Sequence, residues 1–119
     1  MPKEIMLFDR TRKRKVVSRV SHCKTAWSKF AGLMLSLPIR DKCLVFHFDP
    51  PRKVDLHMLF VFFPIDVLFL DKKLKVVEIK ENFMPFTFYM SRKKASYTIE
   101  LPAHTVLAKR IRVGDRLGF

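Results

Sequence analysis

HMLFVFFPIDVLFLD, residues 57–71, is the stretch that decides the fold of this chain. It is almost wholly apolar, but Pro64 and Asp66 interrupt it. A transmembrane helix needs about 20 apolar residues in succession, so this stretch is too short and too broken to span a bilayer. Proline gives no ladder hydrogen bond and belongs at a strand start, an edge or a bulge. The pattern therefore predicts two core strands broken at Pro64, of which the second, Ile65–Leu70, is apolar on both faces and fully buried.

The composition indicates one folded domain over residues 1–119. A chain of 119 residues with 49% hydrophobic residues and 12 Phe is long and apolar enough to form a core. The first ten residues, MPKEIMLFDR, lack the apolar region of a secretory signal, so we expect a cytoplasmic protein. Cys23 and Cys43 are then expected as small buried hydrophobes rather than as a disulfide. The absence of Gln and the single Asn82 among many charges are typical of a thermophile.

Short strands are predicted along most of the chain. In CLVFHF, residues 43–48, and in ASYTIEL, residues 95–101, successive side chains alternate between two faces. Further strands are expected at 4–8, at 15–20 and on both sides of the DKK turn at 71–73, whereas DPPRK at 49–53 is predicted as a turn and 81–94 as a loop. The expected fold class is mainly β (α+β), a small barrel-like or rolled antiparallel sheet, because closure would remove exposed edges.

Two helical segments are predicted. The apolar residues from Cys23 to Met34 recur at the spacing of an amphipathic helix, which predicts a helix over about 22–35. Ser21 is a suitable N-cap for it, and Pro38 prevents its continuation. A short helical turn is expected at about 103–109. In the segment that follows, Gly114 and Asp115 indicate a turn that Asp115 caps.

The charge is strongly basic, with a net charge of +13 and a pI of about 10.2. The densest run is RTRKRK at 10–15, in a predicted hairpin turn, and the loop at 81–94 places Phe and Tyr beside further cations. Cations next to aromatic rings are typical of single-strand binders, so a nucleic-acid partner is one hypothesis. Its candidate residues are Arg10, Arg12, Lys13, Arg14, Lys15, Arg19, Arg92, Lys93 and Lys94. The alternative is a solvated hairpin tip and a loop that covers the core.

Six motifs occur in a recognisable order. They are GLM at 32–34, CLVFHF at 43–48, the stretch at 57–71, VVEIKEN at 76–82, YTIELPA at 97–103 and IRVGDRL at 111–117. In order and spacing they resemble the domain-of-unknown-function family 192 of small prokaryotic proteins, over about residues 16–119. The resemblance implies a compact, mainly β fold and no particular activity. It leaves residues 1–15 as a basic N-terminal extension of a family-like core.

Asp66 is the leading candidate for a functional side chain. It follows Pro64-Ile65 in the motif of the family, and a buried carboxylate is costly unless it is hydrogen-bonded. One hypothesis makes it a general base or a ligand anchor. The alternative is that it accepts backbone N–H groups freed at the proline break. A ligand site is predicted where the motifs converge, at Gly32, Met34, His57 and Asp66. Many bacterial relatives carry a Trp-Met-Lys-Asn run where this chain has residues 57–60, so two polar candidates are apolar here.

No metal or cofactor site is predicted. His22, Cys23, Cys43 and His47 have the residue types of a zinc site, but Cys43 and His47 lie four positions apart on one strand, which is about 13 Å and too far for one ion. A nucleophile set of Cys23, His57 and Asp66 has no local signature.

Three functions remain open at this point. The first is a small non-enzymatic binding or structural module of unknown ligand. The second is a nucleic-acid binder that acts through the basic hairpin, and the third is a small enzyme with Asp66 as its acid or base. The oligomeric state is not predicted.

Overall fold

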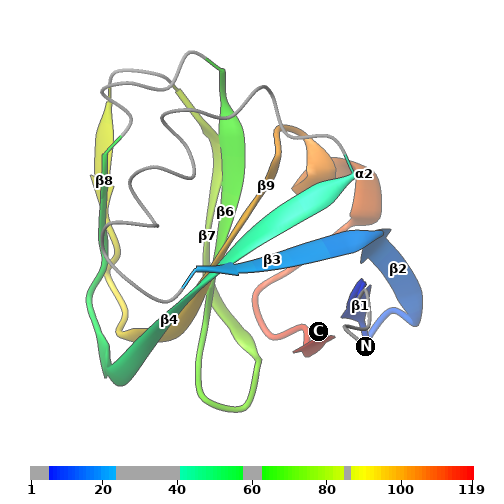
Figure 1. Ribbon diagram of the computed structural model, residues 1–119, viewed down its shortest axis with the longest axis horizontal. Coiled ribbons are helices and arrows are strands. Elements are labelled where there is room, and N and C mark those ends of the chain that lie inside the picture. The colour runs from blue at the N-terminus through cyan, green and yellow to red at the C-terminus, as the bar shows by residue number, and fades with distance from the viewer. Residues whose placement is uncertain (1–5, 24–40, 58–62, 85–86) are drawn as a thin grey trace.

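The computed structural model describes residues 6–23, 41–57, 63–84 and 87–119, which form three sheets and one short helix (Figure 1). The main sheet has five strands in the order β3-β4-β9-β6-β7. Their bounds are β3 Arg19–Cys23, β4 Lys42–Arg52, β9 Ala95–Pro102, β6 Ile65–Leu70 and β7 Val76–Phe83. The smaller sheets are β10-β1-β2 and β5-β8. Their bounds are β1 Leu7–Asp9, β2 Arg14–Val17, β10 Leu117–Gly118, β5 Asp55–His57 and β8 Phe88–Met90, and the helix is α2, Thr105–Lys109.

The centre of the main sheet is β9, which pairs antiparallel with β4 on one side and with β6 on the other. Every residue of β6 is buried, as the apolar run after Pro64 predicts. Pro64 itself lies just before the first residue of the strand, where its missing N–H breaks no ladder. The prediction of a strand that begins after this proline is confirmed.

The two faces of the main sheet carry two separate apolar clusters. On one face, β4, β6 and β9 contribute Cys43, Val45, Leu68, Leu70, Ile99 and Leu101, and residues of the β10-β1-β2 sheet and α2 pack on them. On the other face the cluster includes Leu44, Phe46, Val67, Phe69 and Phe83, with Tyr89 of β8 packed against it. The alternation read from CLVFHF is confirmed, because β4 gives Cys43 and Val45 to the first cluster and Leu44 and Phe46 to the second. In ASYTIEL the predicted common face is confirmed for Tyr97, Ile99 and Leu101, but Ala95 belongs to the second cluster.

The turn at Gly114-Asp115, near the C-terminus, is linked to the N-terminal hairpin through the side chain of Asp115. Asp115 Oδ2 accepts hydrogen bonds from the Arg112 backbone N–H and from Arg12 Nε, each at 3.0 Å. Gly114 has a φ of +99°, which few side chains tolerate. The expected turn at Gly114-Asp115 is therefore confirmed, and the Arg12 contact fastens the N-terminal hairpin to it. The carboxyl group of Asp9 also interacts with Asp115. Burial is the largest cause that raises the pKa of the Asp9 carboxyl.

Several expectations need correction. The sheets are open, so a closed barrel is wrong, although a mainly β fold with a short helix at 105–109 is confirmed. The pair β3 and β4 is parallel, not antiparallel. The predicted helix over 22–35 lies mostly outside the described residues, but His22 and Cys23 belong to β3, so neither its start nor Ser21 as its N-cap is correct. Parallel pairing with β4 outweighed a local capping preference here.

Two segments predicted as irregular are strands. DPPRK was predicted as a turn, but β4 continues through it to Arg52 with a shift of register. The loop at 81–94 contains the end of β7 and the whole of β8. Turn residues dominate DPPRK, and its pairing with β9 overrides this local preference. Residues 81–94 contain few turn residues, and their strands form by pairing with β6 and with β5.

We predict that Leu68→Ala destabilises the protein by about 2–5 kcal/mol, because Leu68 is 0% exposed in the middle of β6 and its truncation leaves a cavity. Leu107→Ala is the matched control, since Leu107 on α2 is 74% exposed and its loss is expected to cost less than about 0.5 kcal/mol. Urea unfolding of both variants measures the difference. Equal effects would contradict the burial of Leu68 in the core.

Candidate ligand-binding site

The most distinctive local feature is the point where β4 separates from β9. The strands are paired at His47↔Tyr97 and next at Arg52↔Ala95. Residues 48–51 therefore lie opposite Ser96 alone. Because Pro50 and Pro51 have no N–H to donate, β4 cannot keep its ladder with β9 across this segment and bulges outward. The bulge opens the sheet beside Ser96.

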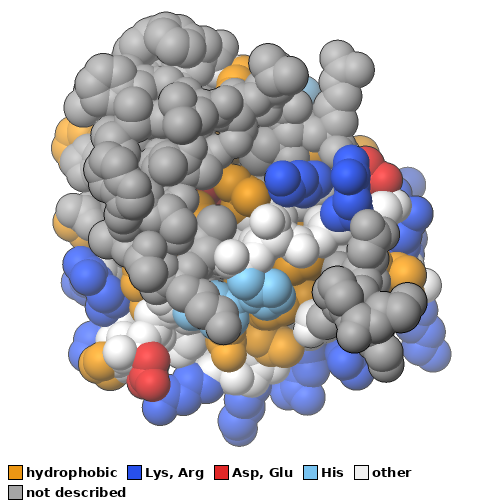
Figure 2. All heavy atoms as spheres, viewed as in Figure 1, with side chains coloured by type: hydrophobic (Ala, Val, Ile, Leu, Met, Phe, Trp, Pro, Cys, Tyr) orange, Lys and Arg blue, Asp and Glu red, His pale blue; other side chains and the backbone are white. Residues whose placement is uncertain are grey.

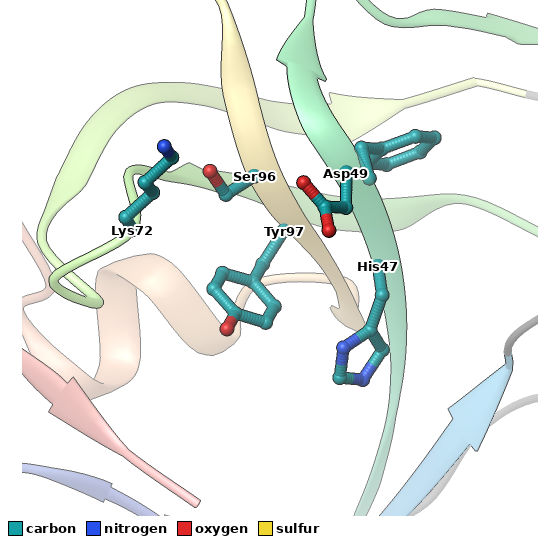
Figure 3. Close-up of a pocket in the computed structure, with 6 residues that line it drawn as sticks. His47, Asp49, Lys72, Ser96 and Tyr97 are labelled. Carbon is teal, nitrogen blue, oxygen red and sulfur yellow. The ribbon is translucent and has the colours of Figure 1, made fainter.

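A hollow of about 400 Å³ lies at this bulge (Figure 3). Its lining comes from β4, from β9 and from the turn between β6 and β7, and consists of His47, Phe48, Asp49, Lys72, Ser96 and Tyr97. In Figure 3 the Ser96 hydroxyl points toward the side of Lys72, and the Asp49 carboxylate points toward Ser96 from the opposite strand. The hollow thus combines aromatic rings with groups of both charges. We call it the ring hollow.

A second hollow of about 320 Å³ adjoins the first and shares Lys72 and Ser96 with it. Its other lining residues are Pro51, Asp71, Lys73 and Lys94. Asp71 Oδ1 accepts the backbone N–H of Lys73 at 2.8 Å and of Lys75 at 3.0 Å, so this carboxylate holds the turn that presents the lysines. We call this second space the lysine hollow, and the two together the bulge pocket.

Ser96 is the buried polar group of the bulge pocket. It is 6% exposed, and its Oγ has no hydrogen-bond partner. A buried hydroxyl without a partner is costly, and such groups are rare in folded proteins. The hydroxyl can both donate and accept, and it lies where the two hollows meet. A ligand that spans both hollows would satisfy it.

Two further polar side chains on the same face of β9 as Ser96 are buried in the core. Thr98 Oγ1 and Glu100 Oε1 are buried and have no hydrogen-bond partner. Burial raises the pKa of Glu100 to about 8, so its carboxyl is mostly protonated at neutral pH. Sequence reasoning noted only that these residues share a face with Ser96. It missed the burial of Glu100. Glu100 is buried because β9 lies between two buried strands, where Glu100 pairs with Leu44 of β4 and with Val67 of β6.

A cluster of aromatic and histidine rings borders the ring hollow. The rings of His47 and Tyr97 are 5.1 Å apart edge to face, and Tyr97 lies 5.6 Å from Phe119. His22 Nδ1 and His47 Nε2 are 2.7 Å apart, because the parallel pairing of β3 with β4 brings these histidines together. Spacing along the chain could not show this contact.

The structure offers no metal centre among the residues it describes, where no three His, Cys, Asp or Glu side chains converge. Cys43 is buried in the core, and burial raises the pKa of its thiol to about 12. It is therefore a packed thiol with little thiolate character.

Asp66 connects three elements and is 1% exposed. Its Oδ1 accepts the backbone N–H of Asn82 at 2.8 Å, and its Oδ2 accepts that of Val106 at 2.9 Å. The carboxylate thus joins β6 to the end of β7 and to the first turn of α2. Both oxygens meet backbone donors, which is the arrangement that the bracing interpretation describes and which argues against a role as acid or base.

The other three residues of the predicted ligand site are Gly32, Met34 and His57. Gly32 and Met34 lie outside the described residues, and for His57 the structure gives only its backbone, in β5. The convergence of these residues on Asp66 stays a prediction.

The basic candidates fall into separate places. Arg10 to Lys15 form the β1–β2 hairpin at the right of Figure 1, while Arg92, Lys93 and Lys94 follow β8 at the left. Figure 2 shows Lys and Arg side chains spread around the visible face rather than gathered in one patch. Three of the candidates have local roles. Arg12 pairs with Asp115, Lys15 Nζ donates a hydrogen bond to Ser18 Oγ at 2.9 Å, and Lys94 lines the lysine hollow.

The fold and this pocket define a small β protein built around one open sheet. The chain belongs to the domain-of-unknown-function family 192, a family of uncharacterised proteins whose model matches residues 6–119. The match begins at residue 6, so the β1–β2 hairpin lies inside it. Leu7, Val16 and Val17 of this hairpin are buried in the core.

The similar proteins have no assigned biochemistry in their names. A UPF0127 protein of Thermococcus sibiricus is 32% identical over 114 residues, which cover 94% of this chain and 73% of that protein. One from Pyrococcus furiosus is 33% identical over 89 residues, 75% of this chain and 76% of that protein. These sources fit the expectation of a thermophile.

Two solved structures share the fold. One, from Sinorhizobium meliloti and provisionally described as a transcription regulator, has a TM-score of 0.84 and 27% identity, covering 95% of this chain and 89% of that one. The other, a Novosphingobium aromaticivorans protein of unknown function, has a TM-score of 0.83 and 19% identity, covering 96% and 82%. Among the described residues, no helix has the length and apolar character to cross a membrane.

We predict that Asp66→Asn destabilises the protein by about 1–3 kcal/mol, because one carboxylate oxygen becomes an amide NH₂ that faces a backbone N–H. Asp49→Asn is the control, since Asp49 is exposed, and its change is expected to stay within about 0.5 kcal/mol. Thermal unfolding at pH 7 compares them. A stable Asp66→Asn variant would show that the carboxylate does not brace the fold.

Glu100 predicts a specific pH dependence. Its carboxyl keeps its proton up to a pH of about 8 in the folded chain, but loses it near the ordinary value of 4.5 when unfolded. Unfolding between these values releases a proton, so the free energy of unfolding falls as pH rises, by up to about 1.4 kcal/mol per pH unit. Glu100→Gln is expected to remove this decline, while Glu81→Gln, at an exposed position, is expected to keep it. The same decline in both variants would contradict a protonated Glu100.

Proposed function

We propose that the protein is a binding module for a small anionic molecule and that the bulge pocket is its site. The observation that carries this proposal is the buried Ser96 hydroxyl without a partner, at the junction of two hollows whose shared cation is Lys72. Each hollow reaches the lower end of the size of small-molecule sites, about 300–1,000 Å³. A phosphate or carboxylate group there would accept hydrogen bonds from the hydroxyl and the ammonium groups.

The charge around the lysine hollow supports an anion. Lys72, Lys73 and Lys94 line it with exposed side chains, and the carboxylate that it contains, Asp71, accepts two backbone N–H groups of its own turn. The net charge of +13 adds a long-range field that attracts anions and accelerates their encounter with the site. These features favour an anionic ligand over a neutral or cationic one.

The test is calorimetric titration with inorganic phosphate, pyrophosphate and acetate, which separates a phosphate site from a carboxylate site. We predict saturable binding that Lys72→Met or Ser96→Ala weakens by about tenfold, because each removes one charged or hydroxyl contact. Lys109→Met on α2 removes an equal charge away from the pocket and is expected to leave affinity unchanged. Equal losses in Lys72→Met and Lys109→Met would show that only net charge matters and would overturn the proposal.

A second candidate function is nucleic-acid binding through the β1–β2 hairpin. Asp9 Oδ1 accepts the backbone N–H groups of Thr11 and Arg12, each at 3.1 Å, and fixes the turn that exposes Lys13, Arg14 and Lys15. The provisional description of the Sinorhizobium meliloti protein as a transcription regulator favours the same reading.

For this second candidate we predict that affinity for single- and double-stranded DNA and RNA falls steeply as salt rises, with a slope that reflects the number of phosphates neutralised. Replacing Lys13, Arg14 and Lys15 with Met is expected to flatten the slope, whereas Lys72→Met is not. Fluorescence anisotropy at several salt concentrations measures both. Absence of binding at low salt would exclude the hairpin as a nucleic-acid surface.

A further inference from the structure

The two halves of the bulge pocket differ in chemistry. The ring hollow is lined by the aromatic side chains of His47, Phe48 and Tyr97 and by the carboxylate of Asp49. The lining of the lysine hollow contains no aromatic side chain and has Lys72, Lys73 and Lys94 instead. Since the halves meet at Lys72 and Ser96, a ligand that fills both has a planar ring at one end and an anionic group at the other.

The ring end has a recognisable hydrogen-bonding requirement. Asp49 is exposed, and a carboxylate only accepts hydrogen bonds, so it favours a ring with N–H donors on the edge beside it. Guanine presents two adjacent N–H donors on one edge, which match the two oxygens of a carboxylate. Adenine and cytosine present one amino group on the corresponding edge, and uracil has one N–H between two carbonyls that repel a carboxylate. The rings of Tyr97 and His47, which contact each other edge to face, line the hollow and give a base aromatic side chains to pack against.

The anionic end fits a phosphate group. Three ammonium groups on two different turns surround the lysine hollow, Lys72 and Lys73 after β6 and Lys94 before β9. Ammonium groups act on phosphate as point charges and need no fixed bidentate geometry. The unpartnered Ser96 hydroxyl lies between the two ends, within the lining of both hollows, where the sugar or the phosphate oxygens of the ligand would pass.

We infer that the ligand of the bulge pocket is a guanine nucleotide, with its base in the ring hollow beside Asp49 and its phosphate in the lysine hollow. This inference rests on the proposed function, because it names the molecule that brings the anion. Asp49 is the residue that selects the base, and Lys72 and Lys94 bind the phosphate.

The test is calorimetric titration of the full chain with GMP, AMP, CMP and UMP, and with guanosine and inorganic phosphate as the two separate ends. We expect GMP to bind about tenfold tighter than the other nucleotides and tighter than either end alone. Asp49→Asn is expected to abolish the preference for GMP while phosphate affinity stays unchanged, because one of the two acceptor oxygens becomes an NH₂ that faces an N–H donor of guanine. Glu81→Gln, an exposed acid on β7, is the control and is expected to keep the preference.

Lys94→Met separates the two ends of the ligand. It is expected to weaken GMP and phosphate alike and to leave guanosine unchanged. If phosphate binds but all four nucleotides bind no tighter than phosphate, the inference of a nucleotide is overturned and the anion-binding function stands. If guanosine binds through Asp49 and phosphate does not bind at all, the anion-binding function is overturned as well.

Discussion

The structure depends on the pairing of β9 between β4 and β6, with both faces of these strands covered by apolar side chains. Leu68, Ile99 and Val45 lie across one face in register, and Phe46 and Phe69 flank Thr98 on the other. A strand that is buried on both faces and bonded on both edges has no freedom to slip, since a shift of one residue would exchange the two clusters. The hairpin at the N-terminus, the turn before β10 and α2 are all positioned by packing on this centre.

The bulge pocket is a consequence of the same pairing. β9 continues straight through the sheet, but Pro50 and Pro51 deprive β4 of two donors, and β4 has to leave β9 before it returns at Arg52. The hollow therefore forms at the edge of a rigid scaffold, with Ser96 fixed by β9 and Lys72 fixed by the turn that Asp71 holds. Such a site is preorganised, and binding loses little entropy in ordering it.

Sequence reasoning located the strands with strong patterns and missed what arises only from long-range pairing. Ile65–Leu70 and ASYTIEL were predicted because burial imposes apolar runs and alternation. The continuation of β4 through DPPRK was missed because its turn residues are overruled by pairing with β9. The strand β8 was missed because it is only three residues long and depends on pairing with β5, far along the chain. Of the residues in the candidate pocket, sequence reasoning had singled out Lys94 for another role and His47 as a rejected ligand. Ser96, Lys72 and Asp49 carry no motif, so only the bulge brings them together.

We propose above all that the bulge between β4 and β9 is a site for an anion. A crystal structure of the protein grown with pyrophosphate tests it most directly. We predict pyrophosphate in the lysine hollow, with an oxygen within hydrogen-bond distance of Ser96 Oγ and of Lys72 Nζ, and β4 bulged at residues 48–51. Pyrophosphate bound only at the β1–β2 hairpin, or a pocket closed by direct pairing of β4 with Ser96, would contradict it.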